Sequence, residues 1–295
     1  MLELLLGFFT NLGLAFTNFA FAVLNPDLWL NWSDKQSLMR FIYYGSSVEL
    51  LYVILVALIL LTAVGIWRPG IMWGSVRLLE GIGNVIGRTV AWAGLIMVIQ
   101  QVIIIVLQRI FRVAEISIGP FGYTFTKDLS WYGEELKLYN AMIVCLCCGY
   151  TFIQGGHVRV DLFYAGASYR TRKIIDMAGS LLFMMPAMCL LWIYSWFFMW
   201  RHMIVPKPSA SDSLERLLAK SRAVRWNVET IGFSPNGFDA YFLFKVLLVA
   251  FTALVFLQAV AFFFRSLLEF RGGPESDGRF SDPDASTGQV EPKSA

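Results

Sequence analysis

The stretch from Trp131 to Asp161 reads WYGEELKLYNAMIVCLCCGYTFIQGGHVRVD and decides the fold. It opens on an aromatic residue and the carboxylates of Glu134 and Glu135, continues as an apolar run, and closes on a glycine pair followed by charged residues. At about 1.5 Å of rise per residue, a helix from Trp131 to Gly155 is long enough to cross a bilayer with some tilt. The stretch therefore predicts a membrane-spanning helix with a polar cluster at each interface.

The composition of the chain is that of a membrane protein. Hydrophobic residues make up 57% of its 295 residues and charged residues only 15%, whereas soluble domains carry about 25% charged residues. The mean hydropathy is +0.60, and the apolar residues gather in blocks long enough to span a bilayer. We therefore expect an all-α, polytopic helical membrane protein in contact with the lipid bilayer. The modest net charge of +3 does not indicate nucleic acid as a partner.

The apolar blocks predict a four-helix membrane core preceded by one or two extra N-terminal membrane helices. Residues 1–24 form a helix that either spans the membrane or lies in its interface. The other predicted helices are Val48 to Trp67, Thr89 to Leu107, the helix after Trp131, Ile174 to Trp200 with a kink at Pro186, and Tyr241 to Phe264.

Three further segments of the chain are more polar. Arg68 to Arg88 is predicted to be a cytoplasmic linker with a short surface helix, and Ser211 to Arg222 has helical periodicity within a polar loop of residues 201–239. Gly, Pro, Ser and Asp dominate after residue 271. We therefore divide the chain into an N-terminal extension (1–87), the four-helix core (88–271) and a disordered cytoplasmic tail (272–295).

Two glutamines in the middle of the Thr89–Leu107 helix are candidate contact residues. An amide that faces lipid loses its hydrogen bonds to water without replacement. At least one of Gln100 and Gln101 should therefore face another helix or another subunit. We favour a contact between helices of this chain over a contact with a substrate.

Glu134 and Glu135 fall in the first turn of their helix, where unpaired N–H groups and the positive end of the helix dipole favour carboxylates. They serve either as helix cap and membrane anchor or as a contact with a cationic or hydrogen-bonding group of a partner subunit. Because neighbouring side chains point about 100° apart on a helix, the two cannot face one partner in the same way.

His157 and Asp161 are four residues apart and would share one face of a continuing helix. The preceding glycines, including Gly156, favour a tight turn instead. A loop that is fixed by local hydrogen bonds and a contact with a partner both stay open for this cluster.

No motif in the sequence indicates an enzyme, a bound cofactor or a metal site. There is no phosphate-binding glycine loop, nucleophile elbow or zinc signature. The four cysteines lie in apolar blocks and are expected to be small packing residues. His157 and His202 would be about a bilayer thickness apart, which argues against a shared haem. Since no predicted helix carries a central charged residue, we expect a scaffold that does not itself conduct.

The order of the two motifs around one membrane helix resembles a known family. W-x-x-E-E-L, one membrane helix and then G-H-V-R-V-D-L is similar to the DctQ-like small membrane subunit of tripartite ATP-independent periplasmic (TRAP) transporters. The resemblance covers roughly residues 88–271. The residues that match the family pattern are Trp131, Glu134, Glu135, Leu136, Gly156, His157, Val158, Val160 and Asp161.

The resemblance implies a scaffold subunit of a sodium-coupled secondary transporter in the bacterial inner membrane that imports an organic acid or a related solute. A large DctM-like membrane subunit would hold the substrate and sodium sites. A periplasmic substrate-binding protein would deliver the solute, and the small subunit would support the large one and help to dock the binding protein.

The orientation of the chain also rests on the resemblance, which places the loop of residues 201–239 in the periplasm. Lys and Arg residues divide nine to nine between the two sides, so the positive-inside rule gives no preference. The competing class of function is a membrane anchor subunit of a respiratory or other redox complex.

Overall fold

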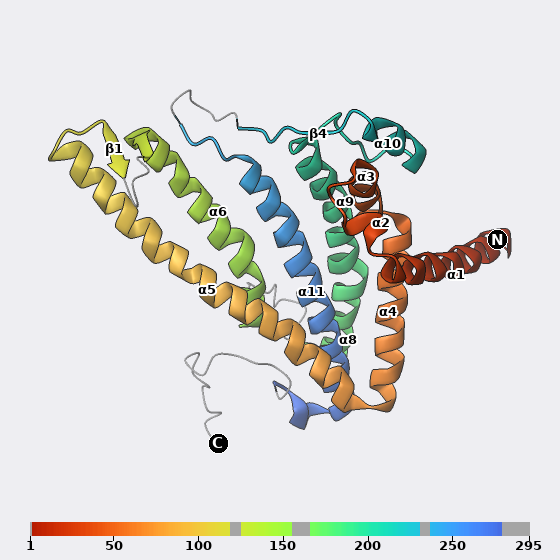
Figure 1. Ribbon diagram of the computed structural model, residues 1–295. Coiled ribbons are helices and arrows are strands. Elements are labelled where there is room, and N and C mark those ends of the chain that lie inside the picture. Colours follow the sequence, from red (N-terminus) through yellow and green to blue (C-terminus); the bar gives the residue numbers. More distant parts are fainter. Residues whose placement is uncertain (1, 119–124, 155–165, 231–236, 279–295) are drawn as a thin grey trace, which may run out of the picture. The chain divides into compact units, whose positions relative to one another are not determined.

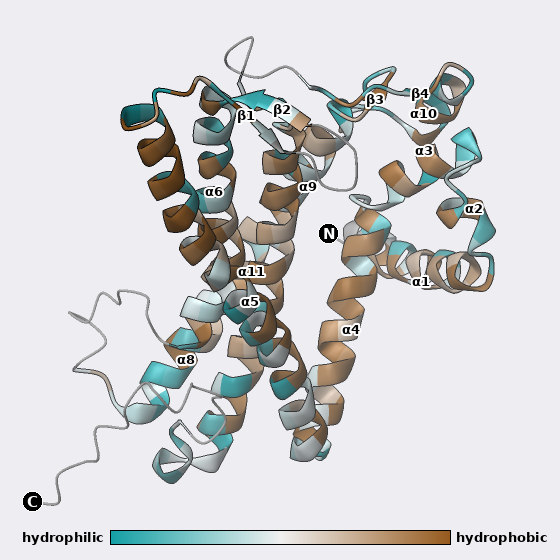
Figure 2. Cartoon of the chain, turned by 60° about the vertical axis from the view of Figure 1, so that its left-hand side comes forward, coloured by the Kyte–Doolittle hydropathy of each residue, from teal (hydrophilic) through white to brown (hydrophobic). Residues whose placement is uncertain are grey.

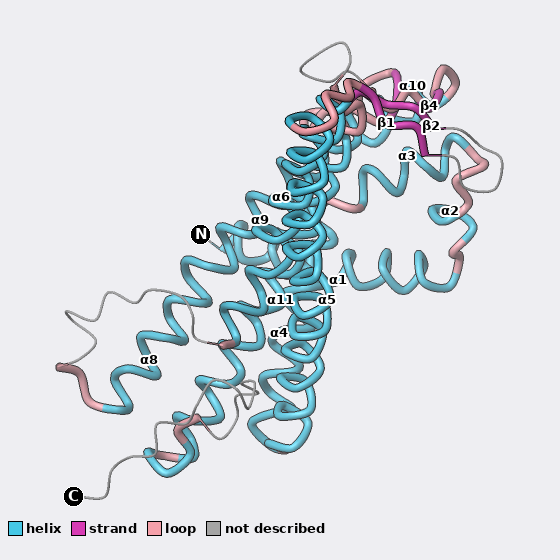
Figure 3. Tube along the Cα trace, turned by 90° about the vertical axis from the view of Figure 1, so that its left-hand side faces the viewer, coloured by secondary structure: helices cyan, strands magenta, loops and turns pink. Residues whose placement is uncertain are grey.

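The computed structural model describes residues 2–118, 125–154, 166–230 and 237–278. Helix occupies most of this part of the chain (Figure 3). Six helical stretches in it are long and apolar enough to cross a membrane. The strands in it form two short antiparallel pairs, β1 (Glu115–Ile118) with β2 (Phe125–Asp128) and β3 (Ile204–Val205) with β4 (Arg225–Trp226). The expected all-α, polytopic membrane fold is confirmed.

The chain forms two compact units, each assembled from two separate parts of the sequence. The first unit contains Met1–Trp67 and Cys189–Glu229, and the second contains Arg68–Met188 and Thr230–Ala295. The predicted division into residues 1–87, 88–271 and 272–295 follows the family resemblance rather than packing, and it stays a prediction.

The first unit contains a short helix with a buried apolar side, which lies between two apolar helices in the sequence. Its elements are α1 (Leu2–Leu24), α2 (Asp27–Leu30), α3 (Lys35–Tyr44), α4 (Val48–Trp67), the second part of α9 (Met185–Arg201), β3, α10 (Leu214–Ser221) and β4. Asp34 caps α3 by accepting hydrogen bonds of 3.2 Å from the N–H groups of Gln36 and Ser37. Ser213 caps α10, which lies inside the segment whose periodicity predicted a helix.

Two indoles hold the carboxyl end of α3 against α9. Trp192 Nε1 donates to the carbonyl oxygen of Gly45 at 2.8 Å, and Trp196 Nε1 donates to that of Ile42 at 2.9 Å. The last carbonyl groups of a helix have no N–H partner within the helix, and the two indoles supply hydrogen-bond donors to carbonyls at this end. Leu38 and Ile42 are fully buried beneath this contact.

The second unit contains three long helices that lie side by side, α5 (Pro69–Arg109), α6 (Leu129–Ile153) and α11 (Phe242–Gly272) (Figure 1). Its other elements are β1, β2, α8 (Tyr169–Gly179), the π-helical η2 (Ser180–Met184), the start of α9 and the 3-10 helix η3 (Pro274–Ser276). Hydrophobic residues run along most of α4 and α11 (Figure 2). Hydrophobic positions all round a helix are typical of a membrane span.

The prediction that Arg68 to Arg88 form a linker is wrong, because all of these residues except Arg68 belong to α5. A helix of 41 residues is roughly 60 Å long, about twice the hydrocarbon thickness of a bilayer. The polar amino-terminal half of α5 is stabilised by a distant part of the chain. Glu80 is buried and accepts a hydrogen bond of 2.9 Å from Nη1 of Arg265 in α11.

The kink predicted at Pro186 appears as a change of helix type directly before it. Residues Ser180–Met184 form a π-helical turn, and α9 follows from Met185. Proline has no N–H to donate and its ring crowds the preceding turn, so a wider turn at this place relieves both problems.

The start of the predicted disordered tail is ordered. Residues 274–276 form η3. Ser276 is buried, and its hydroxyl donates a hydrogen bond of 3.1 Å to the carbonyl oxygen of Glu269. Lys173 on α8 contacts Asp277 at 2.9 Å and also pairs with Glu269 at 2.6 Å. The prediction of disorder is therefore wrong for this short segment, and residues 279–295 lie outside the described part of the chain.

Candidate functional site

The candidate site lies at the amino end of α6, where the motif that decided the fold begins. The helix starts at Leu129 after Asp128, which does not cap it with its side chain. Trp131, Glu134 and Glu135 follow within the first two turns, and all three are partly buried. The prediction that Glu134 and Glu135 lie in the first turn is wrong, because the helix already begins at Leu129 and its first turn holds no acidic residue. The three side chains contact different neighbours.

Trp131 and Glu134 face the segment that leads into α11. Glu134 Oε2 accepts a hydrogen bond of 2.9 Å from the N–H of Phe238 and lies 3.5 Å from the hydroxyl of Tyr241. Trp131 Nε1 donates to Oδ1 of Asp239 at 3.0 Å. The amino end of α6 is thus joined to the segment directly before α11.

Lys127 on β2 completes this contact by pairing with Oδ2 of Asp239 at 3.4 Å. The hydrogen bond from the Trp131 indole, with help from the Lys127 ammonium, holds the pKa of Asp239 below its usual value against the opposing effect of partial burial. The Asp239 carboxylate therefore stays ionised at neutral pH.

Glu135 faces α5 instead. Its Oε2 accepts a hydrogen bond of 3.0 Å from Gln100 Nε2, which also lies 3.3 Å from the carbonyl oxygen of Tyr132. Its Oε1 accepts from the hydroxyl of Tyr139 at 3.3 Å. The adjacent carboxylates therefore serve two different helices, as their angular separation on a helix requires.

The two glutamines of α5 are placed differently. Gln100 is partly buried against α6, whereas Gln101 is exposed. The remaining motif residues Gly156, His157 and Asp161 lie outside the described part of the chain, so their turn or pairing stays a prediction. A role of any of these residues in a contact with another subunit also stays a prediction.

Replacing Gln100 by Leu should weaken the packing of α5 on α6, whereas Gln101→Leu should have almost no effect. The first change removes the donor to Glu135 and Tyr132, and an interhelical hydrogen bond in a membrane protein contributes about 0.6–2 kcal/mol. Unfolding of the two purified variants in the same detergent measures the difference. Equal stability of both would contradict the assignment.

Replacing Trp131 by Phe should raise the pKa of Asp239 toward its ordinary value, because the indole hydrogen bond is the largest cause of its depression. A depressed carboxyl pKa stabilises the fold above the pKa of the unfolded chain, and this contribution is lost as pH falls through the folded pKa. The variant should therefore lose stability at neutral pH and differ less from the parent in acid. Unfolding profiles below and above pH 4 test this, and a stability difference independent of pH would contradict it.

Sequence reasoning missed Asp239, Lys127 and Phe238. The only signal was an acidic residue directly before the last apolar block, and nothing in the sequence pointed to α6 as its neighbour. The described residues contain no group of three or more His, Cys, Asp or Glu side chains that could hold a metal ion. Within the site, side chains of α6 pair with α5 and with the segment directly before α11, which is an arrangement suited to fixing helix positions.

The fold and this site define a polytopic helical membrane protein whose helices are tied together at the amino end of α6. Residues 122–214 match the family model described as tripartite ATP-independent periplasmic transporters, DctQ component. The chain is therefore DctQ-like over this segment, which confirms the resemblance drawn from the motif. No curated protein and no solved structure matches the chain.

Proposed function

We propose that this chain is the small scaffold subunit of a TRAP transporter in the bacterial inner membrane. The observation that carries the proposal is the family match, which begins before the motif at Trp131 and continues through α9 and into α10. The matching family is described as a component of transporters, and we propose no enzymatic activity for this chain. The large DctM-like subunit and a periplasmic substrate-binding protein are the partners in this proposal, with sodium-coupled uptake of an organic acid or a related solute as the process.

The structure supports a scaffolding role through the way in which α5, α6 and α11 are fixed. Glu134 and Trp131 tie α6 to the approach to α11, and Glu135 ties it to α5. At the other end of the helices, Arg265 on α11 pairs with Glu80 on α5. Contacts at both ends oppose sliding or tilting of these helices against one another, which suits a rigid support for a moving partner.

The carboxyl-terminal half of α5 offers a broad apolar face to such a partner or to lipid. About half or more of the residue surface is exposed at Trp92, Leu95, Ile96, Val98, Ile99, Val102 and Ile103. A membrane helix with bulky exposed residues buries them in lipid tails or against another subunit. We assign this face to the large subunit and the proposed periplasmic segments, β1 with β2 and residues 201–239, to docking of the binding protein.

Reconstitution tests the proposal. Proteoliposomes that contain only this chain should show no uptake, and those that contain the chain, the large subunit and the binding protein should accumulate solute when a sodium gradient is applied. Omitting this chain from the complete set should abolish uptake. Uptake by this chain alone, or full uptake without it, would overturn the scaffold role, and a haem or flavin spectrum in the purified complex would favour the redox anchor instead.

A further inference from the structure

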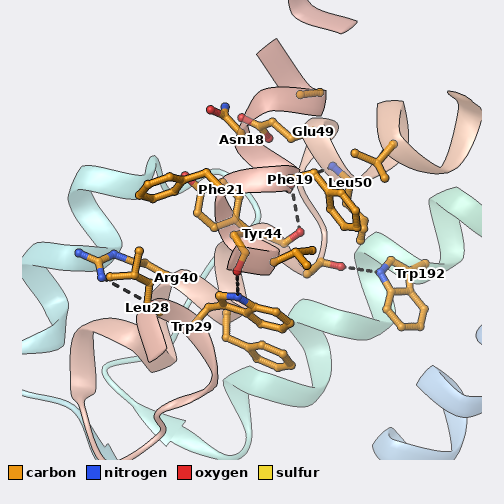
Figure 4. A pocket seen from close by; sticks show the side chains of 17 residues that line it. Asn18, Phe19, Phe21, Leu28, Trp29, Arg40, Tyr44, Glu49, Leu50 and Trp192 are labelled. Carbon is orange, nitrogen blue, oxygen red and sulfur yellow. Dashed lines mark hydrogen bonds between the residues drawn. The ribbon is translucent and has the colours of Figure 1, made fainter. Parts of the chain in front are cut away.

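The first unit contains a partly open cavity of about 540 Å³ that plays no part in the proposed function. Its walls come from α1, from the α2 and α3 region, from the first turns of α4, and from Trp192 on α9 (Figure 4). Its volume is in the range of small-molecule sites, which are mostly apolar with a few polar groups. The lining here fits that description, because rings and aliphatic side chains such as Phe19 and Leu50 make up most of it.

The helices place this cavity at one edge of the membrane. Only the first turns of α4 line it, through Glu49, Leu50 and Val53. Because α4 is just long enough to span the hydrocarbon with its 20 residues, its first turns lie at the head-group level. The indoles of Trp29 and Trp192 also line the cavity, and indoles prefer this level of a membrane.

Helix α1 runs across this same end of α4 at a steep angle (Figures 1 and 3). The ring of Phe8 meets that of Tyr52 near the start of α4, with 5.5 Å between centroids. If α4 follows the membrane normal, α1 lies close to the membrane plane, with exposed side chains such as Phe9 and Leu14 in the lipid. The sequence left open whether residues 1–24 span the membrane or lie in its interface, and we adopt the interfacial helix here.

Two opposite charges line the cavity and set its ligand chemistry. Figure 4 shows Glu49 beside Asn18 at one edge and Arg40 near Leu28 at another. Within the described part of the chain, the Arg40 guanidinium donates a single long hydrogen bond, 3.5 Å to the carbonyl oxygen of Leu28, which leaves most of its N–H donors available. Because Arg40 and Glu49 carry opposite charges, the cavity favours a ligand whose own charges sum to zero.

We propose that this cavity binds one phospholipid with a zwitterionic head group that carries a primary ammonium. Arg40 receives the phosphate, since guanidinium groups hydrogen-bond phosphate oxygens strongly. Glu49 receives the ammonium, and the aromatic and aliphatic walls hold part of an acyl chain. A bound lipid fills the space between α1, α3 and α4 and so fixes the interfacial helix to the rest of the first unit.

Native mass spectrometry of the full-length chain, delipidated in detergent, tests the site with three lipids that share the same acyl chains. The probes are phosphatidylethanolamine, phosphatidylglycerol and diacylglycerol. The parent chain should bind one phosphatidylethanolamine at least about tenfold more tightly than either other lipid, because only this lipid satisfies both charges. Equal affinity for all three would overturn the proposal, and so would preferential binding of phosphatidylglycerol.

Two charge variants and two controls make the test specific. Arg40→Gln should lose about tenfold or more in affinity for phosphatidylethanolamine, and Glu49→Gln should erase its preference over phosphatidylglycerol. Lys35→Gln, which removes an exposed charge outside the cavity, should leave both affinities unchanged. Ala22→Phe, which fills the cavity and keeps both charges, should bind none of the three lipids. This variant keeps the proposal testable if Arg40→Gln fails to fold. Unchanged phosphatidylethanolamine binding in either Arg40→Gln or Ala22→Phe would refute the site.

Discussion

Replacing Arg265 by Met should destabilise the second unit by about 3–5 kcal/mol, because it leaves Glu80 as a buried carboxylate without its cation. The side chains of Arg265 and Glu80 are only 10% and 2% exposed, so water cannot replace the lost partner. Arg265 also lies over the ring of Phe262, with 5.2 Å from Cζ to the centroid. The free energy of unfolding in detergent measures the loss.

Replacing both charges together is the matched control. In Arg265→Met with Glu80→Met, neither charge of this pair is left buried without the other. Exchanging a buried ion pair for apolar side chains of similar volume is often neutral or stabilising. The double variant should therefore recover most of the stability that the single variant loses. A single variant as stable as the parent, or a double variant less stable than the single one, would show that this pair does not hold α5 to α11.

Replacing Gly87 by Ala should force α5 and α6 apart, because the two helices pack closely at this glycine. The added Cβ would lie 2.3 Å from the Cβ of Tyr150, an atom that is fixed by the backbone of α6 and cannot rotate away. The cysteine Cys147 also approaches this point, with its Sγ 3.4 Å from the carbonyl oxygen of Gly87. Overpacking of this kind costs about 1–3 kcal/mol and occasionally more.

Gly81, six residues earlier on the same helix, gives the control. Nothing lies within 4 Å of a Cβ added at this position, so Gly81→Ala should be neutral or gain up to about 1 kcal/mol from its better helix propensity. Unfolding of the two variants under identical conditions compares them directly. Equal stability of both would mean that α5 and α6 are not in contact at Gly87.

The structure confirms helices at all six predicted apolar blocks, which are residues 1–24, 48–67, 89–107, 174–200, 241–264 and the block after Trp131. Inside a membrane a helix satisfies the backbone groups of such a block within the block itself. The short helix α10 was also visible, because Ser213 and the periodicity after it are local signals. The amino-terminal half of α5 was missed because its polar residues looked like those of a loop.

The candidate site was predicted only in part for a related reason. The different directions of Glu134 and Glu135 follow from the geometry of one helix, and the sequence contains that information. Their partners Phe238 and Gln100 are 104 and 35 residues away along the chain. No local pattern encodes such distant neighbours.

The sequence by itself determined the class of protein, because the hydropathy of a helix decides whether it lies in lipid or in water. The order of two short motifs around one helix also indicated the family. The tertiary structure alone decided which polar groups meet. Glu80 lies in a segment that was predicted to be a linker, and it is tolerated at a helix interface because Arg265, 185 residues later on α11, donates a hydrogen bond to it. A buried charge is stabilised by its partner in space, and that partner is set by the packing of whole helices rather than by neighbours in sequence.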